Sequence, residues 1–455
     1  MTRTLAAVAT QVQGRLIGAD RGFGDVSTDT RTLGSGALFV AIVGERFDGN
    51  DFIAEAHSKG ASGALVSRAA SVPLPQIEVG DTRRALGGMA RAWRENFDIP
   101  VVAVTGSAGK TTVKELIAAI LGQRRRICVT RGNLNNDIGV PLTLLGLDAD
   151  DKALVVELGA NHAGEIGYLS ALAEPTVGVI TLAGAAHLEG FGSIAGVAAA
   201  KGELLDHLPR AGTAVLNADD PFCGDWRSRT RSDSVLTFGL AASADCSVVG
   251  EPTLGPAGSS FQMRLPDGSE IAVDLPLAGI KNVVNALAAA AAAFAVGAPV
   301  EDIRSGLEHA VAVRGRMTLL NGIGGASIVD DSYNANPASV RAALDYLAEL
   351  PGRRVFVLGD MGELGSDAEA LHRDVGRYAR DRCDRFFAIG PLAALAAEAF
   401  GSGGRSFADI AAAEAAITEL LGPDLCVLVK GSRLTGLERL VARLVDPATS
   451  RSASC

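Results

Sequence analysis

Several features that mark secreted, membrane-bound or nucleic-acid-binding proteins are missing from this chain. Its six cysteines in 455 residues form no CxxC pair, which favours reduced thiols over a disulfide framework. Acidic and basic residues are interspersed at a formal net charge of -10, which leaves no basic stripe for nucleic acid or for a membrane surface. The most apolar stretch, residues 286–296, is too short to span a bilayer, and the N-terminus MTRTLAAVATQVQG has no continuous apolar segment. We therefore expect a cytoplasmic protein with no membrane insertion and no nucleic-acid partner.

The length of the chain predicts about three domains of roughly 150 residues, each with its own core. In the first of them, apolar residues 37–42 and 64–66 flank a helix-like segment, DFIAEAHSKG, that Gly60 closes. A proline-containing stretch, SVPLPQIEVGD, then leads into an amphipathic segment at residues 82–97. This pattern predicts a small α/β unit at residues 1–82.

Strands and helices alternate through the middle of the chain. This alternation predicts a parallel sheet with helices on both faces in a second domain, residues 83–312. A hairpin around Pro266 and Gly268 and an alanine-rich helix at residues 282–296 complete it. The strands that we expect are residues 101–105, 154–158, 177–181 and 213–216, with helices after Thr111 and around residues 198–207.

A third α/β cycle fills residues 313–455. Its expected strands are residues 327–330, 354–358, 385–389 and 426–429, and its expected helices include residues 337–350 and 408–421. Only the tail, PATSRSASC, has a composition typical of disorder.

The segment VVAVTGSAGKTT combines a buried-strand pattern with a glycine-rich turn and the start of a helix. Its glycines would let backbone amides approach phosphate oxygens, while Lys110 supplies a charge for the terminal phosphates and Thr111 a hydroxyl for Mg²⁺. The common pattern has a glycine where this chain has Val104, so the loop is a variant. It predicts a site for ATP or GTP. The residues of this site are Gly106, Ser107, Ala108, Gly109, Lys110, Thr111 and Thr112.

Three more side chains follow strands or helices of the same predicted sheet. Glu157 ends a strand at the edge where parallel sheets bind ligands, and is interpreted as a Mg²⁺ ligand or as a solvated carboxylate. His187 follows the next strand, where a structural role and a ligand role both fit. Lys201, in VAAAKGELL, has the local pattern of an ordinary surface lysine.

Polar residues also cluster near the second domain boundary. Arg316 and its neighbour Arg314 suit phosphoryl groups, and the pair ending in Asp331 suits ribose hydroxyls, although a charged linker fits as well. Asn282 and Asn285 are three residues apart at a helix start, where they either cap the helix or contact a base edge.

Taken in order, short motifs along nearly the whole chain resemble the Mur ligase family of ATP-dependent amide-bond synthetases. These motifs are STDTR, GERFDGNDFIAEAHSKGA, TGSAGKTTVKE, NLNNDIGVPLTLL, ELGANHAGEI, AHLEGFGS, AAKGELL, GIKNVVNALAA, GRM, DDSYNANP, LGDMGELG and KGSR. The resemblance implies a UDP-binding first domain, a central ATPase domain with the phosphate loop, and a Rossmann-like third domain that closes on the substrates.

The resemblance also implies a reaction. ATP would phosphorylate the C-terminal carboxylate of UDP-N-acetylmuramoyl-tripeptide, and the amine of D-alanyl-D-alanine would attack the acyl phosphate. We expect a monomer that uses ATP and Mg²⁺. The site residues implied are Lys110 and Arg316 at the phosphates, Thr111 and Glu157 on one Mg²⁺, His187 and a carbamylated Lys201 on a second, Asn282 with Asn285 at the adenine, Asp331 at the ribose, and Asp29, Arg31 and Asp48 at the UDP end.

Three rival interpretations are weaker. A sibling that adds a single amino acid, or a folylpolyglutamate synthase, does not explain NLNNDIGVPLTLL together with DDSYNANP and LGDMGELG. A regulatory GTPase would carry an NKxD segment, which this sequence does not contain. An inactive scaffold would have lost Lys110, Glu157 or Lys201, and all three are present.

Overall fold

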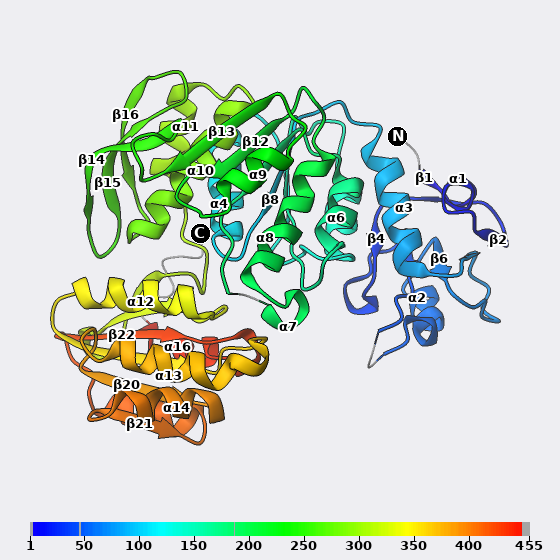
Figure 1. The fold of residues 1–455 in the computed structure, drawn as a ribbon. Coiled ribbons are helices and arrows are strands. Elements are labelled where there is room, and N and C mark those ends of the chain that lie inside the picture. The colour runs from blue at the N-terminus through cyan, green and yellow to red at the C-terminus, as the bar shows by residue number, and fades with distance from the viewer. Residues whose placement is uncertain (1–2, 45–46, 186, 448–455) are drawn as a thin grey trace.

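The fold is given by a computed structural model that describes residues 3–44, 47–185 and 187–447 (Figure 1). Sheets of five, nine and six strands follow one another along the chain, and a two-stranded sheet pairs β1 (Arg3–Thr4) with β3 (Gly22–Phe23). All three larger sheets contain parallel strands, which confirms the expected α/β class. Within the described residues, no helix is both long and apolar enough to cross a membrane. The tail expected to be disordered lies outside the described residues from residue 448 onward.

The five-stranded sheet has the order β2-β7-β6-β5-β4. Its strands β4 to β7 are parallel, and β2 is an antiparallel edge. The helix expected in DFIAEAHSKG is present as α2. The elements are β2 (Arg15–Ile17), β4 (Val26–Ser27), β5 (Leu38–Val40), β6 (Gly63–Val66) and β7 (Gln76–Glu78), with α1 (Leu5–Gln11), α2 (Ile53–Ser58) and the short 3₁₀ helices η1 (Thr30–Thr32) and η2 (Gly49–Phe52).

The nine-stranded sheet has the order β16-β15-β14-β13-β12-β11-β8-β10-β9. Strands β8 to β14 are parallel, and the expected hairpin is present as the antiparallel pair β15–β16. The strands are β8 (Val101–Thr105), β9 (Cys128–Val129), β10 (Leu154–Glu157), β11 (Val177–Ile180), β12 (Thr213–Asn217), β13 (Ser234–Gly239), β14 (Cys246–Leu254), β15 (Ser259–Arg264) and β16 (Glu270–Leu275).

Helices cover both faces of this sheet, as its sequence pattern predicted. Because successive strand residues point to opposite faces, Val101 packs in a core with α3, α5 and α6, whereas Val102 packs in another with α4, α10 and α11. The helices are α3 (Thr82–Arg94), α4 (Lys110–Leu121), α5 (Gly139–Leu145), α6 (Glu165–Ala173), α7 (Leu188–Phe191), α8 (Ile194–Gly202), η3 (Glu203–His207), α9 (Cys223–Arg229), α10 (Ile280–Ala295) and α11 (Val300–Glu308).

The six-stranded sheet has the order β17-β18-β22-β19-β20-β21, with β17 antiparallel and the others parallel. Figure 1 shows this unit, coloured yellow to red, below the central sheet. Its elements are β17 (Thr318–Asn321), η4 (Ile323–Gly325), β18 (Ser327–Asp331), α12 (Pro337–Glu349), β19 (Arg353–Gly359), η5 (Gly365–Asp367), α13 (Ala368–Ala379), β20 (Arg385–Ile389), α14 (Pro391–Phe400), β21 (Gly404–Phe407), α15 (Ile410–Thr418), β22 (Leu425–Lys430), η6 (Arg433–Thr435) and α16 (Glu438–Leu444).

The first unit has a buried cluster of its own, which includes Phe39, Ile53 and Val66, but it also shares a second cluster with the central sheet. Leu5 and Leu38 from the first unit belong to the same buried cluster as Val101 and Leu154 from the central sheet. Helix α3 joins them, because its buried residues Leu86 and Met89 lie in that cluster. The six-stranded sheet is packed in two further clusters of its own, to which, among the described residues, the central unit adds only Ala278.

Candidate active site

The glycine-rich turn connects β8 to α4 at the carboxyl edge of the central sheet. Gly109 adopts φ 81°, and a Cβ atom there would lie 2.5 Å from Asn285 Oδ1, so both the backbone conformation and the space require glycine. Lys110 is the first residue of α4, and its Nζ donates to the Gly106 carbonyl oxygen at 2.7 Å. Burial lowers the pKa of Lys110, with Glu157 opposing and Arg316 adding to this effect.

The turn is fixed by the loop that follows β11. Ser107 N donates to the Leu182 carbonyl at 2.9 Å, and Thr181 Oγ1 donates to the Ala108 carbonyl at 2.6 Å. Gly184 N in turn donates to Ser107 Oγ at 3.0 Å. These bonds leave the turn with a defined shape before any ligand binds, as a preorganised phosphate site requires.

Glu157, at the end of β10, is buried and is held by hydrogen bonds to both carboxylate oxygens. Thr111 Oγ1 donates to Oε2 at 2.8 Å, and Asn135 Nδ2 donates to Oε1 at 2.8 Å. The backbone amide of Glu157 donates to Thr130 Oγ1 at 3.0 Å, and Thr130 O accepts from the buried Lys114 Nζ at 2.7 Å. The solvated-carboxylate interpretation of Glu157 is therefore wrong. Asn135 and Lys114 lie in motifs that the sequence showed, but no signal in them pointed to contacts around Glu157.

Lys201 is only 2% exposed, so the local pattern of a surface lysine was misleading. Alanines flank it in α8, and their small side chains let the helix pack closely. Lys201 Nζ lies 3.5 Å from the Ala160 carbonyl and 5.0 Å from the centre of the Phe191 ring. Burial, followed by the nearby charge of Lys110, lowers the pKa of Lys201 to about 7.

His187 precedes α7 with a left-handed backbone, φ 54°. Its Nδ1 contacts a carboxylate oxygen of Glu363, which belongs to the six-stranded unit. Burial lowers the pKa of His187, Glu363 opposes that shift, and the charges of Lys110 and Lys201 add to it. His187 therefore lies within the electrostatic reach of both lysines and at a contact between two units. Sequence reasoning did not single out Glu363.

Arg316 joins the phosphate loop to the six-stranded unit. Its Nη2 donates to Thr111 Oγ1 at 3.0 Å, and its guanidinium lies 4.3 Å from the centre of the Tyr333 ring. Its Nε is buried and has no hydrogen-bond partner among the described residues.

Asp331 accepts from Lys430 Nζ at 2.6 Å, and burial raises the pKa of Asp331 while Lys430 opposes the shift. The charged-linker interpretation therefore fails for Arg316 and for Asp331, whereas Arg314 is exposed.

The two asparagines of α10 contact each other rather than cap the helix. Asn285 Nδ2 donates to Asn282 Oδ1 at 3.2 Å, and Asn282 Nδ2 donates to the Ala278 carbonyl at 2.8 Å. Gly279 precedes the helix without a side-chain cap, so the capping interpretation is wrong. A cavity of about 220 Å³ is lined by Asn282, Arg316 and residues of α4, including Thr112 and Leu116.

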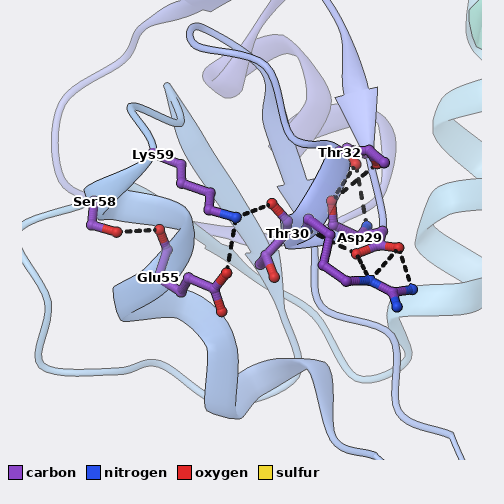
Figure 2. Close-up of polar contacts among 8 residues, drawn as sticks. Asp29, Thr30, Thr32, Glu55, Ser58 and Lys59 are labelled. Carbon is purple, nitrogen blue, oxygen red and sulfur yellow. Dashed lines mark hydrogen bonds and ion pairs between the residues drawn. The ribbon is translucent and has the colours of Figure 1, made fainter.

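Asp29 and Arg31 follow β4, and Asp48 follows β5, at the carboxyl edge of the first sheet. Figure 2 shows Asp29 next to Thr30, whose carbonyl accepts from Lys59 Nζ at 2.8 Å. Arg31 donates through Nε and Nη2 to Asp29, and this bonding lowers the pKa of the Asp29 carboxyl. Asp48 accepts from Asn50 and pairs with Arg68 at 3.0 Å. These residues make local contacts and none to the phosphate loop in the described residues. Arg68, two residues after the end of β6, was missed by sequence reasoning.

The structure thus brings the phosphate loop, Glu157, Arg316, Asn285, His187 and Lys201 to one edge of the central sheet. Among the described residues, no three His, Cys, Asp or Glu side chains form a cluster that could hold a metal ion. A metal at this edge would need hydroxyl, backbone or modified-lysine ligands in addition.

In the comparison with known proteins, three domain models of the Mur ligase family match successive parts of the chain. They are the Mur ligase family catalytic domain at residues 24–94, the Mur ligase middle domain at residues 104–293, and the Mur ligase glutamate ligase domain at residues 315–433. The UDP-N-acetylmuramoyl-tripeptide–D-alanyl-D-alanine ligase of Escherichia coli K12 is 44% identical, covering 98% of this chain and 99% of its own.

Two solved structures extend the comparison. The crystal structure of MurF from Acinetobacter baumannii superposes with a TM-score of 0.91 at 37% identity, covering 97% of this chain and 98% of that one. MurF ligase from Thermotoga maritima, solved in complex with ADP, gives a TM-score of 0.82 at 28% identity, covering 92% and 96%.

Proposed function

Because this chain belongs to the Mur ligase family, we propose that it is an ATP-dependent ligase that joins D-alanyl-D-alanine to UDP-N-acetylmuramoyl-tripeptide in peptidoglycan precursor synthesis. The observation that carries the proposal is that two cationic side chains meet at the glycine-rich turn: Lys110 donates to the Gly106 carbonyl, and Arg316 donates to Thr111. The similarity over nearly the full length to a ligase named for these two substrates supports the choice of substrates.

The reaction has two steps. The C-terminal carboxylate of the tripeptide attacks the γ-phosphorus of ATP, the bond to the bridging oxygen breaks, and ADP and an acyl phosphate form. The amine of the dipeptide, having lost the proton of its ammonium form, attacks the acyl carbon. The tetrahedral intermediate loses a second proton and expels inorganic phosphate, which leaves the new peptide bond.

The side chains at the turn address the main physical obstacle, which is the repulsion between a carboxylate and a triphosphate. Lys110 and Arg316 place two positive charges where negative charge is transferred. The buried, unpartnered Nε of Arg316 fits an anionic ligand, because a buried donor without an acceptor is otherwise unfavourable. A mobile surface arginine would not provide this directed donor.

We propose that Thr111 and Glu157 hold one Mg²⁺, and that His187 with carbamylated Lys201 holds a second. The donors fit, because hydroxyl and carboxylate oxygens are the ligands that this hard cation prefers, and the two oxygens of Thr111 and Glu157 lie 2.8 Å apart. Bound Mg²⁺ supplies positive charge at the phosphate oxygens during transfer.

Carbamylation requires the neutral amine of Lys201. The amine nitrogen bonds to the carbon of CO₂ and releases a proton, so that an anionic oxygen ligand replaces a cation. The pKa of about 7 that burial and Lys110 give to Lys201 supports this step, because a large fraction of the amine is then neutral near pH 7.

The remaining roles are proposed from position. Asn282 and Asn285 contact the adenine and Asp331 the ribose, since Asn282 lines a cavity beside α4.

Each of the three units has its own role in this proposal. The first unit, residues 1–82, binds the UDP end through Asp29, Arg31 and Asp48. Residues 83–312 bind ATP, and residues 313–455 close over both ligands. We also propose that the protein acts in the cytoplasm, because ATP and a uridine-nucleotide precursor are cytoplasmic metabolites, and that it acts as a monomer.

The proposal is tested by phosphate release from purified protein with ATP, Mg²⁺ and UDP-N-acetylmuramoyl-tripeptide, with and without D-alanyl-D-alanine. We expect release to depend on the dipeptide, because the acyl phosphate has no amine acceptor without it. Full ATP turnover in the absence of both peptide substrates would rule the proposal out.

A further inference from the structure

Three loops of the six-stranded unit meet at one edge of its sheet. They follow the carboxyl ends of the parallel strands β18, β22 and β19, which are neighbours in the sheet. The loops, here called the edge loops, are residues 332–336, 431–437 and 360–367. Parallel sheets bind ligands at this edge.

Arg433 is the only arginine or lysine in the edge loops. It is exposed, and within the described part of the chain its guanidinium has neither a hydrogen bond nor an ion pair, although it lies 5.7 Å from the centre of the Tyr333 ring. The guanidinium of Arg316 lies 4.3 Å from the centre of the same ring. Tyr333 therefore connects Arg433 to the arginine that contacts the phosphate loop.

Three other charged side chains at or beside these loops, Lys430, Asp360 and Glu363, already have partners. Lys430, at the end of β22, donates to Asp331 at 2.6 Å and to the Asn334 carbonyl at 2.9 Å. Asp360 accepts from Ala393 N at 2.6 Å, and Glu363 contacts His187. The guanidinium of Arg433 can therefore bind an anionic ligand that enters from outside the protein.

We propose that Arg433 binds the C-terminal carboxylate of the incoming D-alanyl-D-alanine and so sets the specificity for a dipeptide with a free carboxylate. This inference rests on the proposed function. The dipeptide must place its amine at the acyl phosphate beside Arg316, and two residues of extended chain reach at most about 7 Å. The guanidinium groups of Arg316 and Arg433 lie 4.3 Å and 5.7 Å from the centre of the same Tyr333 ring, so no more than about 10 Å separates them. An extended dipeptide together with a hydrogen bond of about 3 Å at its carboxylate bridges that span.

The chemistry favours arginine for this role. A carboxylate that leaves water on binding needs a compensating charge, and a guanidinium offers two parallel donors that match its geometry. The Tyr333 ring, whose centre lies 5.7 Å from the guanidinium, attracts this cation and favours positions near the ring before the dipeptide arrives. Because Arg433 belongs to the unit that closes over ATP, dipeptide binding would also favour the closed arrangement.

The test compares D-alanyl-D-alanine with its C-terminal amide, D-alanyl-D-alaninamide, as acceptors in the phosphate-release assay. The variants are Arg433→Met, which keeps most of the side-chain volume, and Arg433→Lys, which keeps the charge without the fork. Arg314→Met is the matched control, because Arg314 is also exposed and lies on the adjoining linker.

We expect the unaltered protein to prefer the free carboxylate in kcat/KM. Arg433→Met should raise KM for D-alanyl-D-alanine on the order of 10- to 100-fold and leave the amide nearly unaffected, so that the preference falls towards one. Arg433→Lys should give an intermediate preference, and Arg314→Met should keep it. A general structural defect would weaken both acceptors equally.

Two outcomes overturn the inference. An unchanged preference in Arg433→Met would exclude Arg433, and loss of the preference in Arg314→Met alone would assign the carboxylate to the linker. Either result leaves ligation intact and so differs from failure of the proposed function, in which neither acceptor would support phosphate release by the unaltered protein.

Discussion

At the scale of single residues, Lys201 differs most from its sequence-based interpretation. Its local sequence was interpreted as that of an ordinary surface lysine, although the flanking alanines leave room for its stem in a packed site, and the structure buries the side chain. Such burial depends on contacts between residues far apart in the chain, which a local pattern does not contain. The same limit applies to Glu363, whose contact with His187 joins two units.

The residues of the phosphate loop were predictable, because their chemistry is local. A turn that presents backbone amides to phosphate needs glycine at positive φ, and Gly109 has φ 81°. By contrast, the hydrogen bonds that fix the turn come from Thr181 and Leu182, in the loop that follows β11, the strand next to β8. Strand order in the sheet was not predictable from periodicity.

The carbamate proposal predicts a specific pattern of chemical rescue. Lys201→Ala should be nearly inactive while folded, and formate or acetate should restore part of the activity by entering the vacated space as an oxygen ligand. Short amines should not restore it, because they supply charge of the wrong sign. Phosphate release with each additive is the measurement. Rescue by amines alone, or full activity without any additive, would contradict the proposal.

The lowered pKa of Lys201 also predicts a dependence of stability on pH. Below about pH 7 both the folded and unfolded states carry the proton, so the unfavourable burial of the charge is fully present. Between about pH 7 and its ordinary value of 10.5, the unfolded state binds more protons, so the free energy of unfolding rises with pH. Lys201→Met should therefore be more stable than the unaltered protein at pH 6 by a few kcal/mol, because each unit of pKa shift corresponds to roughly 1.4 kcal/mol. This difference in the free energy of unfolding should become smaller towards pH 10.

Urea unfolding at pH 6 and pH 9 in CO₂-depleted buffer measures this difference. Lys281→Met, which alters an exposed lysine of α10, is the control and should show no such closing gap. A stability difference that is equal at both pH values would show that Lys201 titrates at its ordinary pKa.

At the scale of helices and strands, the sequence predicted the regular elements well where apolar periodicity was strong. Residues 101–105 and 385–389 are the strands β8 and β20 as expected, and the alanine-rich helix is α10. Shorter strands such as β9 and β21 were missed. β9 has two residues and is defined by pairing with β10, whereas β21 is defined by pairing with β20, so both depend on partners distant in sequence.

Helix α4, which carries Lys110, is positioned by a close approach of α11. A Cβ atom on Gly306 of α11 would lie 2.4 Å from Ile120 Cα, so the two backbones touch at this point. Gly306→Ala should therefore lower Tm by several degrees, because the overlap costs more than the roughly 1 kcal/mol that alanine contributes to helix propensity.

Gly224→Ala is the matched control for this helix contact. Gly224 lies in α9, and a Cβ atom there would have nothing within 4 Å, so alanine should leave Tm unchanged or raise it. Thermal unfolding of both variants is the measurement. If Gly306→Ala is as stable as Gly224→Ala, the backbones of α11 and α4 do not approach each other as closely as described.

At the scale of the whole molecule, the units are joined in two different ways. The first unit and the central sheet share one hydrophobic cluster, which favours a fixed arrangement. The third unit meets the central one mainly through polar contacts, including Tyr346 Oη to the Pro256 carbonyl at 2.7 Å, Arg316 to Thr111, and Glu363 to His187. Small polar contacts of this kind are compatible with opening of the third unit.

This difference predicts that ligands shift the third unit alone. Arg316 and Asp331 flank the junction, and both are proposed to contact one ATP, so a bound nucleotide would favour the closed form through contacts that an open form cannot make. Small-angle scattering should show a smaller radius of gyration with a non-hydrolysable ATP analogue and UDP-N-acetylmuramoyl-tripeptide than without them. Lys110→Ala, whose nucleotide site is impaired, should compact much less at the same ligand concentrations. An equal radius of gyration with and without ligands in the unaltered protein would mean that closure is complete before binding, and that the polar contacts between the two units suffice to hold them together.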